Sequence, residues 1–335
     1  MTMVLGLLIR GYAFQVSDRL VTQAGGGAVR PFDPLANKTV IFRARDGILA
    51  IGYSGRAYLD GVPTDVWIAQ SLAAREFSTQ FGMGAVDVSP SQWRHSGPTI
   101  TRLRADAEAA IGRLTEQERN SHLQRFQIIG IKLAKRTPKV RPLLCTIEEP
   151  SYGSALSLAH YGRHLAWDRQ YLLMATPDMA AEELARLRSE LKARANEGPD
   201  TCEAILAASI RRIADEDPTV GKDLMAVQIK SRDPHVQIRY LPFTSEASPS
   251  HEGLPLAYTP WIIAPPSVHG PALSNGGWTT RHLSWSVVGL PTQEGPARAM
   301  QKLSSSSLSV NPSEIRRAGH RARATNLAAT RGGLP

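Results

Sequence analysis

The order in which strands and helices follow one another most strongly constrains how this chain folds. Short apolar runs predict groups of strands, and each of the first two groups is followed by a pair of helices. No single helix alternates with single strands, so a doubly wound parallel sheet is excluded. Two antiparallel sheets packed face to face, with a helix pair outside each, would bury every apolar face. The sequence therefore predicts an α+β protein.

The individual elements are predicted from periodicity and turn signals. Strands are expected at 2–9, 12–18, 38–44, 48–54, 125–133, 141–147, 223–230 and 235–243, with a less clear apolar stretch over 154–175. Helices are expected at 63–78, 99–119, 178–196 and 200–214. Arg10-Gly11 and Arg45-Asp46-Gly47 have the composition of tight hairpin turns. Three glycines at 25–27, with prolines nearby, predict a loop over 23–34.

Composition divides the chain into three parts. Residues 1–244 hold the predicted α+β domain, and the Ser-, Pro- and Gly-rich residues 245–303 are interpreted as an irregular, strand-containing extension packed on it. Residues 304–335 begin with four serines and are expected to be a basic, disordered tail. From residue 301 onward there are six basic residues and one acidic residue, which account for most of the net charge of +9. Such a tail can touch nucleic acid or acidic lipid, but a solvated end is the favoured interpretation.

Cysteine usage and the first apolar run indicate the compartment. Two cysteines, Cys145 and Cys202, are too few for a disulfide framework, so we expect a reducing, cytoplasmic setting. The apolar run over 3–9 is interrupted by Arg10 and is much too short to span a membrane. No basic region precedes it, as a signal peptide would require. We therefore interpret this run as a buried strand and expect no membrane partner.

Thr2 is the residue to which the sequence assigns the central chemical role. If Met1 is removed, Thr2 becomes a free N-terminus that carries a hydroxyl nucleophile and an amine on one residue. A free α-amine has a pKa of about 7.7–8.0, so part of it is neutral at pH 7 and can accept the hydroxyl proton. If Met1 stays, the nitrogen is an amide and this base does not exist. The alternative interpretation is that Thr2 simply follows the initiating methionine.

Three further residues could complete such a site. Asp18 ends the second predicted strand, and Lys38 begins the third. A lysine paired with this carboxylate beside the nucleophile would lower the pKa of the amine and stabilise an alkoxide-like state. Gly55 follows a strand that leads toward a helix, where a backbone N–H could point at an oxyanion. The alternative for each residue is ordinary: a surface Asp, a surface Lys and a strand-exit glycine.

Taken together, these segments resemble the proteasome β-subunit group of N-terminal-nucleophile hydrolases. The matching segments are Thr2-Met-Val-Leu-Gly, Val16-Ser-Asp-Arg19, Lys38-Thr-Val-Ile-Phe and Ile51-Gly-Tyr-Ser-Gly55. In that family the nucleophilic Thr and the Asp stand sixteen residues apart, as Thr2 and Asp18 do. The resemblance implies a four-layer αββα sandwich, Thr2 as nucleophile, Asp18 and Lys38 as its charged partners, Gly55 as oxyanion donor, and assembly into a homo-oligomer.

The sequence also departs from the family pattern. The family usually has an Asp-x-x-Ser-Gly-Gly segment, and here Glu216 and Thr219 keep its spacing but not its residue types. Ala175-Thr176-Pro177 stands where the family has a Ser-Gly-x-Gly segment, and the loop between Asp18 and Lys38 is longer than usual. Arg19, Glu216 and Thr219 are therefore secondary candidates for the site. The extension after 245 has no counterpart in the compact family members.

Other chemistries have weaker signals. His160 and His164 have a helical metal-ligand spacing, but Gly162 lies between them and no Glu follows the first His. The glycines at 25–27 lack the Lys-Ser/Thr of a phosphate loop. Cys145 lies in a buried apolar run, which favours packing over catalysis.

The favoured hypothesis is a threonine-dependent hydrolase of amide bonds in peptides, which needs no metal or organic cofactor. A catalytically silent protein of the same fold, serving as an assembly or interaction subunit, is the main alternative. A third interpretation gives the basic tail a nucleic-acid partner, which we do not expect.

Overall fold

The computed structural model contains strands, helices and turns over most of the chain before residue 244 and over short segments beyond it. No helix in these segments is long and apolar enough to cross a membrane. The residues that the structure describes are 2–9, 11–25, 28–33, 36–74, 86–87, 94–133, 140–161, 172–176, 178–231, 235–243, 250–251, 254–265, 267–271, 273–275 and 285–286. The predicted tail over 304–335 lies outside them.

Six strands form the first large sheet, and all of its described neighbours pair antiparallel. Side chains alternate between the two faces of this sheet, and both faces bury apolar residues, although the buried Gln15 and Gln228 interrupt the apolar runs of its two central strands. In spatial order the strands are β13 (Leu172–Ala175), β1 (Val4–Ile9), β2 (Tyr12–Asp18), β14 (Leu224–Lys230), β15 (His235–Leu241) and β21 (Trp285–Ser286).

Eight strands form the second large sheet. Their spatial order is β12 (Ser157–Tyr161), β11 (Val140–Glu148), β10 (Arg125–Leu133), β6 (Gly47–Ser54), β5 (Thr39–Ala44), β18 (Trp261–Ala264), β19 (Ser267–His269) and β9 (Val86–Asp87). β18 pairs with β5 in parallel, whereas the other described strand pairs in this sheet are antiparallel. A segment from beyond residue 245 therefore supplies a strand to the sheet that the N-terminal part begins.

Small sheets and helices complete the described elements. β3 (Val21–Gly25) pairs with β4 (Ala28–Asp33), β7 (Tyr58–Leu59) with β8 (Val62–Pro63), and β17 (Leu254–Tyr258) with β16 (Ser250–His251) and β20 (Leu273–Asn275). The helices are α1 (Thr64–Ala73), α2 (Ser96–Gly112), α3 (Glu116–Arg119), α4 (Ala181–Arg194) and α5 (Pro199–Glu216), with a 3-10 turn at Ala195–Glu197.

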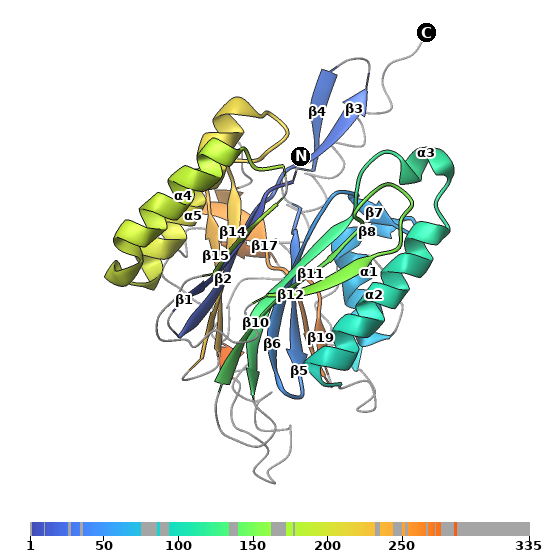
Figure 1. Cartoon of the computed structure of the whole chain (residues 1–335), viewed down its shortest axis with the longest axis horizontal. Helices are drawn as coiled ribbons and strands as arrows, with labels where there is room; N and C mark the ends of the chain where they lie inside the picture. Colours follow the sequence, from blue (N-terminus) through green and yellow to red (C-terminus); the bar gives the residue numbers. More distant parts are fainter. Residues whose placement is uncertain are drawn as a thin grey trace.

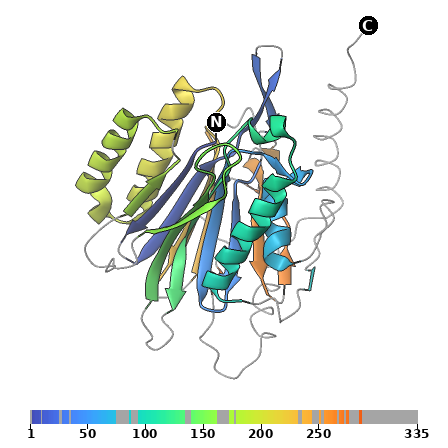
Figure 2. The same ribbon diagram turned by 45° about the vertical axis from the view of Figure 1, so that its right-hand side comes forward.

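Three buried apolar clusters show what each face contacts. Leu8 of the first sheet and Ile129 of the second belong to one cluster, which also includes Ile262 of β18. A second cluster joins α1 and α2 to the eight-stranded sheet, and a third joins α4 and α5 to the six-stranded sheet. Figures 1 and 2 show these helix pairs on opposite sides of the strands. The architecture is a mixed α/β one in which strands predominate.

Two of the predicted elements differ in the structure. Residues 23–34 were expected to form a loop, but β3 and β4 form a hairpin in which Gly25 pairs with Ala28. Gly25 thus lies at the end of this hairpin, and the pairing has a register shift between Val21 and Thr22. The helix predicted over 99–119 ends at Gly112, and α3 starts separately because Thr115 and Glu118 form a capping box.

Candidate active site

The sixteen-residue spacing between Thr2 and Asp18 follows from the register of the first hairpin. Val4 of β1 lies opposite Ser17 of β2, so the next pair outward is Met3 and Asp18. The Met3 N–H donates to Asp18 Oδ1 at 2.8 Å, and the Asp18 N–H donates to the Met3 carbonyl at 3.1 Å. The carboxylate is thereby fixed to the residue that directly follows Thr2, and Thr2 itself is half-buried.

Asp18 and Lys38 form a fully buried ion pair. Lys38 Nζ lies 2.7 Å from Asp18 Oδ2 and also donates to the Leu20 carbonyl at 2.6 Å. Asp18 Oδ2 additionally accepts the backbone N–H groups of Leu20 and Gly221, each at 3.2 Å. The structure therefore brings together the two predicted charged residues, and it confirms neither as catalytic. The contacts satisfy both charges, as buried charges require.

Burial and neighbouring charges act on Lys38 in opposite directions. Loss of hydration lowers the pKa of Lys38 below its ordinary value, while the adjacent Asp18 carboxylate and, more weakly, Asp33 favour its charged form. A lysine in this setting can hold a positive potential next to the N-terminal strand. It can also release its proton more readily than a solvated lysine.

Gly55 occupies a position that no other residue could fill without strain. Its φ is +101°, and a Cβ added there would lie 2.0 Å from the Leu123 carbonyl oxygen. It comes directly after β6, whose last residue, Ser54, lies opposite Arg125 of β10. Glycine is therefore required for the close approach of two backbones. This steric requirement is independent of any role in binding an oxyanion.

A second buried ion pair holds the segment behind Gly55. Arg56 Nη1 lies 2.7 Å from Glu149 Oε2, and Arg56 Nη2 donates to the Arg119 carbonyl at 2.7 Å. Glu149 also accepts backbone N–H groups from Gln124 at 3.1 Å and Gly153 at 2.9 Å. Sequence reasoning did not identify this pair, because its members are far apart in the chain and neither belongs to a local motif.

The secondary candidates lie in different surroundings. Arg19 is fully buried, and its guanidinium stands 4.9 Å from the centre of the Tyr240 ring. Glu216 is exposed at the end of α5. Thr219 donates through both its N–H and its hydroxyl to Asp217 Oδ1, at 2.8 and 2.6 Å. These contacts place Arg19 inside the fold and hold Thr219 in a local turn.

Gly221 makes the contact that links the segment after α5 to the ion pair. Its N–H donates to Asp18, and a Cβ added there would lie 2.8 Å from the Cβ of Leu20. Sequence reasoning considered the segment but concentrated on Glu216 and Thr219. The signal that could have identified Gly221 is a glycine two residues after a turn, where a backbone N–H must come close to another strand.

Thr176 lies next to the N-terminal strand. Its hydroxyl is 2.7 Å from the Met3 sulfur, and both residues are buried. β13, which precedes Thr176, pairs with β1 such that Ala175 lies opposite Leu5. The segment that departs from the family pattern therefore packs against the residue following Thr2.

Weaker sequence signals pointed to other kinds of site. His160 lies on β12, and His164 is outside the described residues. No group of three or more His, Cys, Asp or Glu side chains among the described residues could hold a metal ion. Cys145 and Cys202 are both buried, and burial raises the pKa of Cys202 to about 11. A thiol in this state is a weak nucleophile.

Comparison with known proteins finds distant similarity among solved structures alone. No protein-family model matches the chain, and no curated protein matches it. Among solved structures, it is similar to Anbu (ancestral beta-subunit) from Yersinia bercovieri, with 14% sequence identity and a TM-score of 0.41. The match covers 68% of this chain and 82% of that chain. Similarity at this level transfers no activity from one protein to the other.

Proposed function

We propose that this chain is a threonine-dependent hydrolase of amide bonds in peptides, with Thr2 as the nucleophile after removal of Met1. The observation that carries the proposal is the fully buried Asp18–Lys38 pair, which is bonded to the backbone of Met3. Burying two charges costs free energy of desolvation, and their mutual attraction offsets this cost only when the two groups are in close, well-aligned contact. Here the pair lies beside the one residue that could be both nucleophile and base.

The architecture that fits this proposal is a four-layer αββα sandwich for residues 1–244. Support comes from the three buried clusters, one of which contains residues of both large sheets. The other two join each sheet to its own helix pair. In such an arrangement the ends of the strands form the rim of the sandwich, where a chain terminus can meet side chains from both sheets.

The proposed reaction begins with proton transfer within Thr2. The neutral α-amine accepts the proton of the Thr2 hydroxyl as Oγ forms a bond to the substrate carbonyl carbon. The positive charge of Lys38 lowers the pKa of the amine, which keeps more of it neutral at pH 7. The same charge stabilises the developing negative charge on Oγ. Asp18 holds Lys38 in place through the 2.7 Å contact.

The Gly55 N–H is proposed to stabilise the tetrahedral oxyanion. When that intermediate collapses, the C–N bond breaks and the departing amine takes the proton from the Thr2 ammonium. An ester to Oγ remains. The Thr2 amine then accepts a proton from water as the water attacks the ester, and the resulting carboxylic acid leaves with Oγ reprotonated. The reaction consumes one water molecule, and Thr2 ends in the state in which it began.

The test combines mass measurement, covalent labelling and turnover. Intact-mass measurement of purified protein shows whether Met1 is absent. A β-lactone probe should then add its own mass to one site, and a panel of fluorogenic peptides should be cleaved. Thr2→Ala should lose labelling and cleavage and keep its circular dichroism spectrum, whereas Thr2→Ser should retain both. Thr101→Ala, at an exposed position on α2, is the matched control. Unchanged cleavage by Thr2→Ala refutes the proposal.

A catalytically silent assembly subunit of the same fold is the second candidate. It is favoured by the exposure of Glu216 and by the local bonding of Thr219 to Asp217. It predicts that Met1 is retained and that the protein forms a homo-oligomer in light-scattering measurements. A monomer that lacks Met1 and reacts with the β-lactone probe would exclude it.

A further inference from the structure

The contact between the two large sheets changes from apolar to polar toward the end of β1 that follows Thr2. Leu8 of β1 and Ile129 of β10 belong to the apolar cluster between the sheets. Residues two positions apart on a strand point to the same face, so the next positions toward Thr2 on the facing sides of five strands follow from the register. They hold Gly6, Gln15, Thr39, Gly52 and Gln127. A layer of glycine and polar residues therefore lies between the apolar cluster and the N-terminal end of β1.

Two glutamines from opposite sheets meet in this layer. Gln15 is fully buried and Gln127 is 2% exposed. Gln15 Nε2 donates to the Gln127 carbonyl at 3.1 Å and lies 3.5 Å from Gln127 Oε1, while the Thr39 hydroxyl donates to Gln15 Oε1 at 2.9 Å. A buried amide is costly without partners, and these bonds therefore fix the position of each side chain. The network connects β2 of the six-stranded sheet to β5 and β10 of the eight-stranded sheet.

Two glycines make the room that these amides occupy. A Cβ added at Gly6 would lie 2.8 Å from Gln127 Oε1, and one added at Gly52 would lie 2.9 Å from the side-chain amide of Gln15. Both distances are shorter than the contacts of real Cβ atoms, so alanine at either position would displace the amide. Glycine weakens a strand interior, and its presence at these positions therefore marks a close approach. Each glutamine faces a glycine on the opposite sheet.

The Gln127 amide also joins the N-terminal strand to its neighbour. Gln127 Nε2 donates to the Met174 carbonyl of β13 at 3.3 Å and to the Val4 carbonyl of β1 at 3.5 Å. An amide NH₂ carries two hydrogens, so one side chain can serve both carbonyls. Val4 is two positions from Thr2 in the chain. One side chain of the eight-stranded sheet thus holds the start of β1 and the neighbouring part of β13 together.

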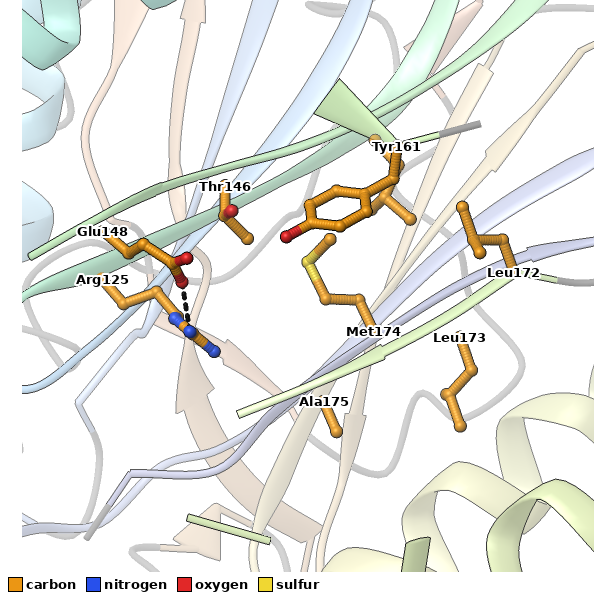
Figure 3. A pocket seen from close by; sticks show the side chains of 9 residues that line it. Arg125, Thr146, Glu148, Tyr161, Leu172, Leu173, Met174 and Ala175 are labelled. Atoms are coloured by element: carbon orange, nitrogen blue, oxygen red, sulfur yellow. Dashed lines mark hydrogen bonds and ion pairs between the residues drawn. The ribbon is translucent and has the colours of Figure 1, made fainter. Parts of the chain in front are cut away.

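The edge position of β13 makes this link important. β13 is the edge strand of the six-stranded sheet and pairs with β1. A cavity of about 150 Å³ lies between β13 and β12, the edge strand of the eight-stranded sheet. Figure 3 shows Met174 of β13 and Tyr161 of β12 facing each other across this cavity. Because the two edge strands are apart here, Gln127 supplies a link between the sheets at this edge.

We propose that Gln127 is a positioning residue for Thr2, an inference that rests on the proposed hydrolase function. Thr2 leads into the six-stranded sheet, whereas Lys38 and Gly55 adjoin strands of the eight-stranded sheet. Attack by Thr2 Oγ requires alignment across the contact between the sheets, and a shift of about 1 Å costs up to about a hundredfold in rate. The Gln127 amide sets that alignment through the carbonyl of Val4, without contacting the nucleophile or the substrate.

Peptide kinetics and hydrogen exchange on the full chain test this role. Gln127→Met keeps the side-chain length and removes the amide, so kcat should fall about tenfold while KM stays within about twofold. Amide hydrogen exchange over residues 2–9 should be about fivefold faster, with exchange in α2 unchanged. An active wild type with unchanged kcat or unchanged exchange in Gln127→Met overturns this proposal alone. A wild type that neither cleaves peptides nor reacts with the β-lactone probe overturns the proposed function and this positioning role together.

Gly6→Ala perturbs the same amide from the opposite sheet. Its methyl group displaces the Gln127 amide, and kcat should again fall about tenfold. Gln127→Ala vacates that space, so adding Gly6→Ala to it should lower kcat by a further factor of less than about two. Gln228→Met replaces another buried glutamine, on β14 opposite Phe14, and is the matched control that should keep wild-type kcat and exchange. Independent, multiplicative losses from Gly6→Ala and Gln127→Ala refute the coupling.

Discussion

The Asp18–Lys38 and Arg56–Glu149 pairs are both buried, and each has a contact of 2.7 Å between its charged atoms. In both, the carboxylate also accepts a backbone N–H from a distant segment, Gly221 for Asp18 and Gln124 for Glu149. They differ in the cation. The Arg56 guanidinium donates to two acceptors, Glu149 and the Arg119 carbonyl, whereas burial lowers the pKa of Lys38.

This difference separates a structural clamp from a tunable charge. Arginine suits a site in which only geometry matters, because its planar guanidinium group loses little conformational entropy for each hydrogen bond that it makes. Lysine is a point charge whose protonation responds to its surroundings. The position next to Met3 has the lysine, and the position behind Gly55 has the arginine. We therefore expect the two pairs to respond differently when their charges are removed.

The largest effect is expected from removing the charges beside Met3. The double variant Asp18→Asn with Lys38→Met leaves no unpaired charge, so its unfolding free energy should stay within about 2 kcal/mol of wild type. Peptide cleavage should fall about a hundredfold or more, because the potential at Thr2 is lost. Steady-state kinetics and urea unfolding on the same preparations measure both quantities. Wild-type cleavage rates in this variant would remove Lys38 from the mechanism.

Breaking the second pair should affect stability rather than turnover. Glu149→Gln leaves the buried Arg56 charge without its partner, and we expect a loss of about 3–5 kcal/mol of unfolding free energy. Cleavage per folded molecule should change less than threefold. The paired variant Arg56→Met with Glu149→Gln is the control and should recover part of the stability. If Glu149→Gln lowers cleavage as strongly as loss of Lys38, the proposed division between clamp and tunable charge is wrong.

A smaller effect is expected from Asp65, at the start of α1. Burial raises its pKa to about 7, and Asp33 adds to the shift. The unfolded state has lost this proton above about pH 4. The folded state retains it to about pH 7, so unfolding free energy should fall as pH rises through that window. Asp65→Asn should remove about 1–3 kcal/mol of this fall, measured by urea unfolding at pH 4, 5, 6 and 7.

Glu203 provides the internal check on that prediction. Burial also raises its pKa to about 7, although the Arg239 charge opposes the shift. Its contribution has the same sign and persists in Asp65→Asn, so the variant should keep part of the pH dependence. An identical pH profile for wild type and Asp65→Asn would contradict the assigned cause.

The smallest effect is expected from an exposed ion pair. Arg113 and Asp60 are bonded, but the Arg113 side chain is 61% exposed. Such pairs contribute about 0–1 kcal/mol because water screens them and two long side chains must be ordered. Arg113→Ala should therefore change the urea midpoint only slightly, and 0.5 M NaCl should erase the difference. If Arg113→Ala lost as much unfolding free energy as Glu149→Gln, the exposure of an ion pair would not determine its contribution to stability.

Local patterns predicted much of the strand and helix framework. The runs at 12–18 and 125–133 match β2 and β10, because apolar periodicity and turn residues act within a few positions. The meeting of Asp18 and Lys38 was also predicted, because Asp18 ends one predicted strand and Lys38 opens the next. The register that places Asp18 beside Met3, with Val4 opposite Ser17, comes from the structure.

Contacts between distant segments could not be read from the sequence. Gly221 contacts Asp18 at a separation of 203 residues, and Arg56 contacts Glu149 at a separation of 93 residues. Neither contact leaves a periodic signal, because each depends on how the two sheets and their loops are placed. The same is true of the cavity lined by Thr146 and Leu172, which exists only where the edge strands of the two large sheets come together (Figure 3). Tertiary geometry, rather than local propensity, decides such features.

The parallel pairing of β18 with β5 has a consequence for the order of synthesis. β5 emerges from the ribosome more than two hundred residues before Trp261, its partner in the register. Until translation reaches that point, the edge of β5 offers unpaired amide and carbonyl groups to any neighbouring chain. Completion of the eight-stranded sheet is therefore a late event, and a chain that stops at residue 245 leaves the ribosome with that edge open.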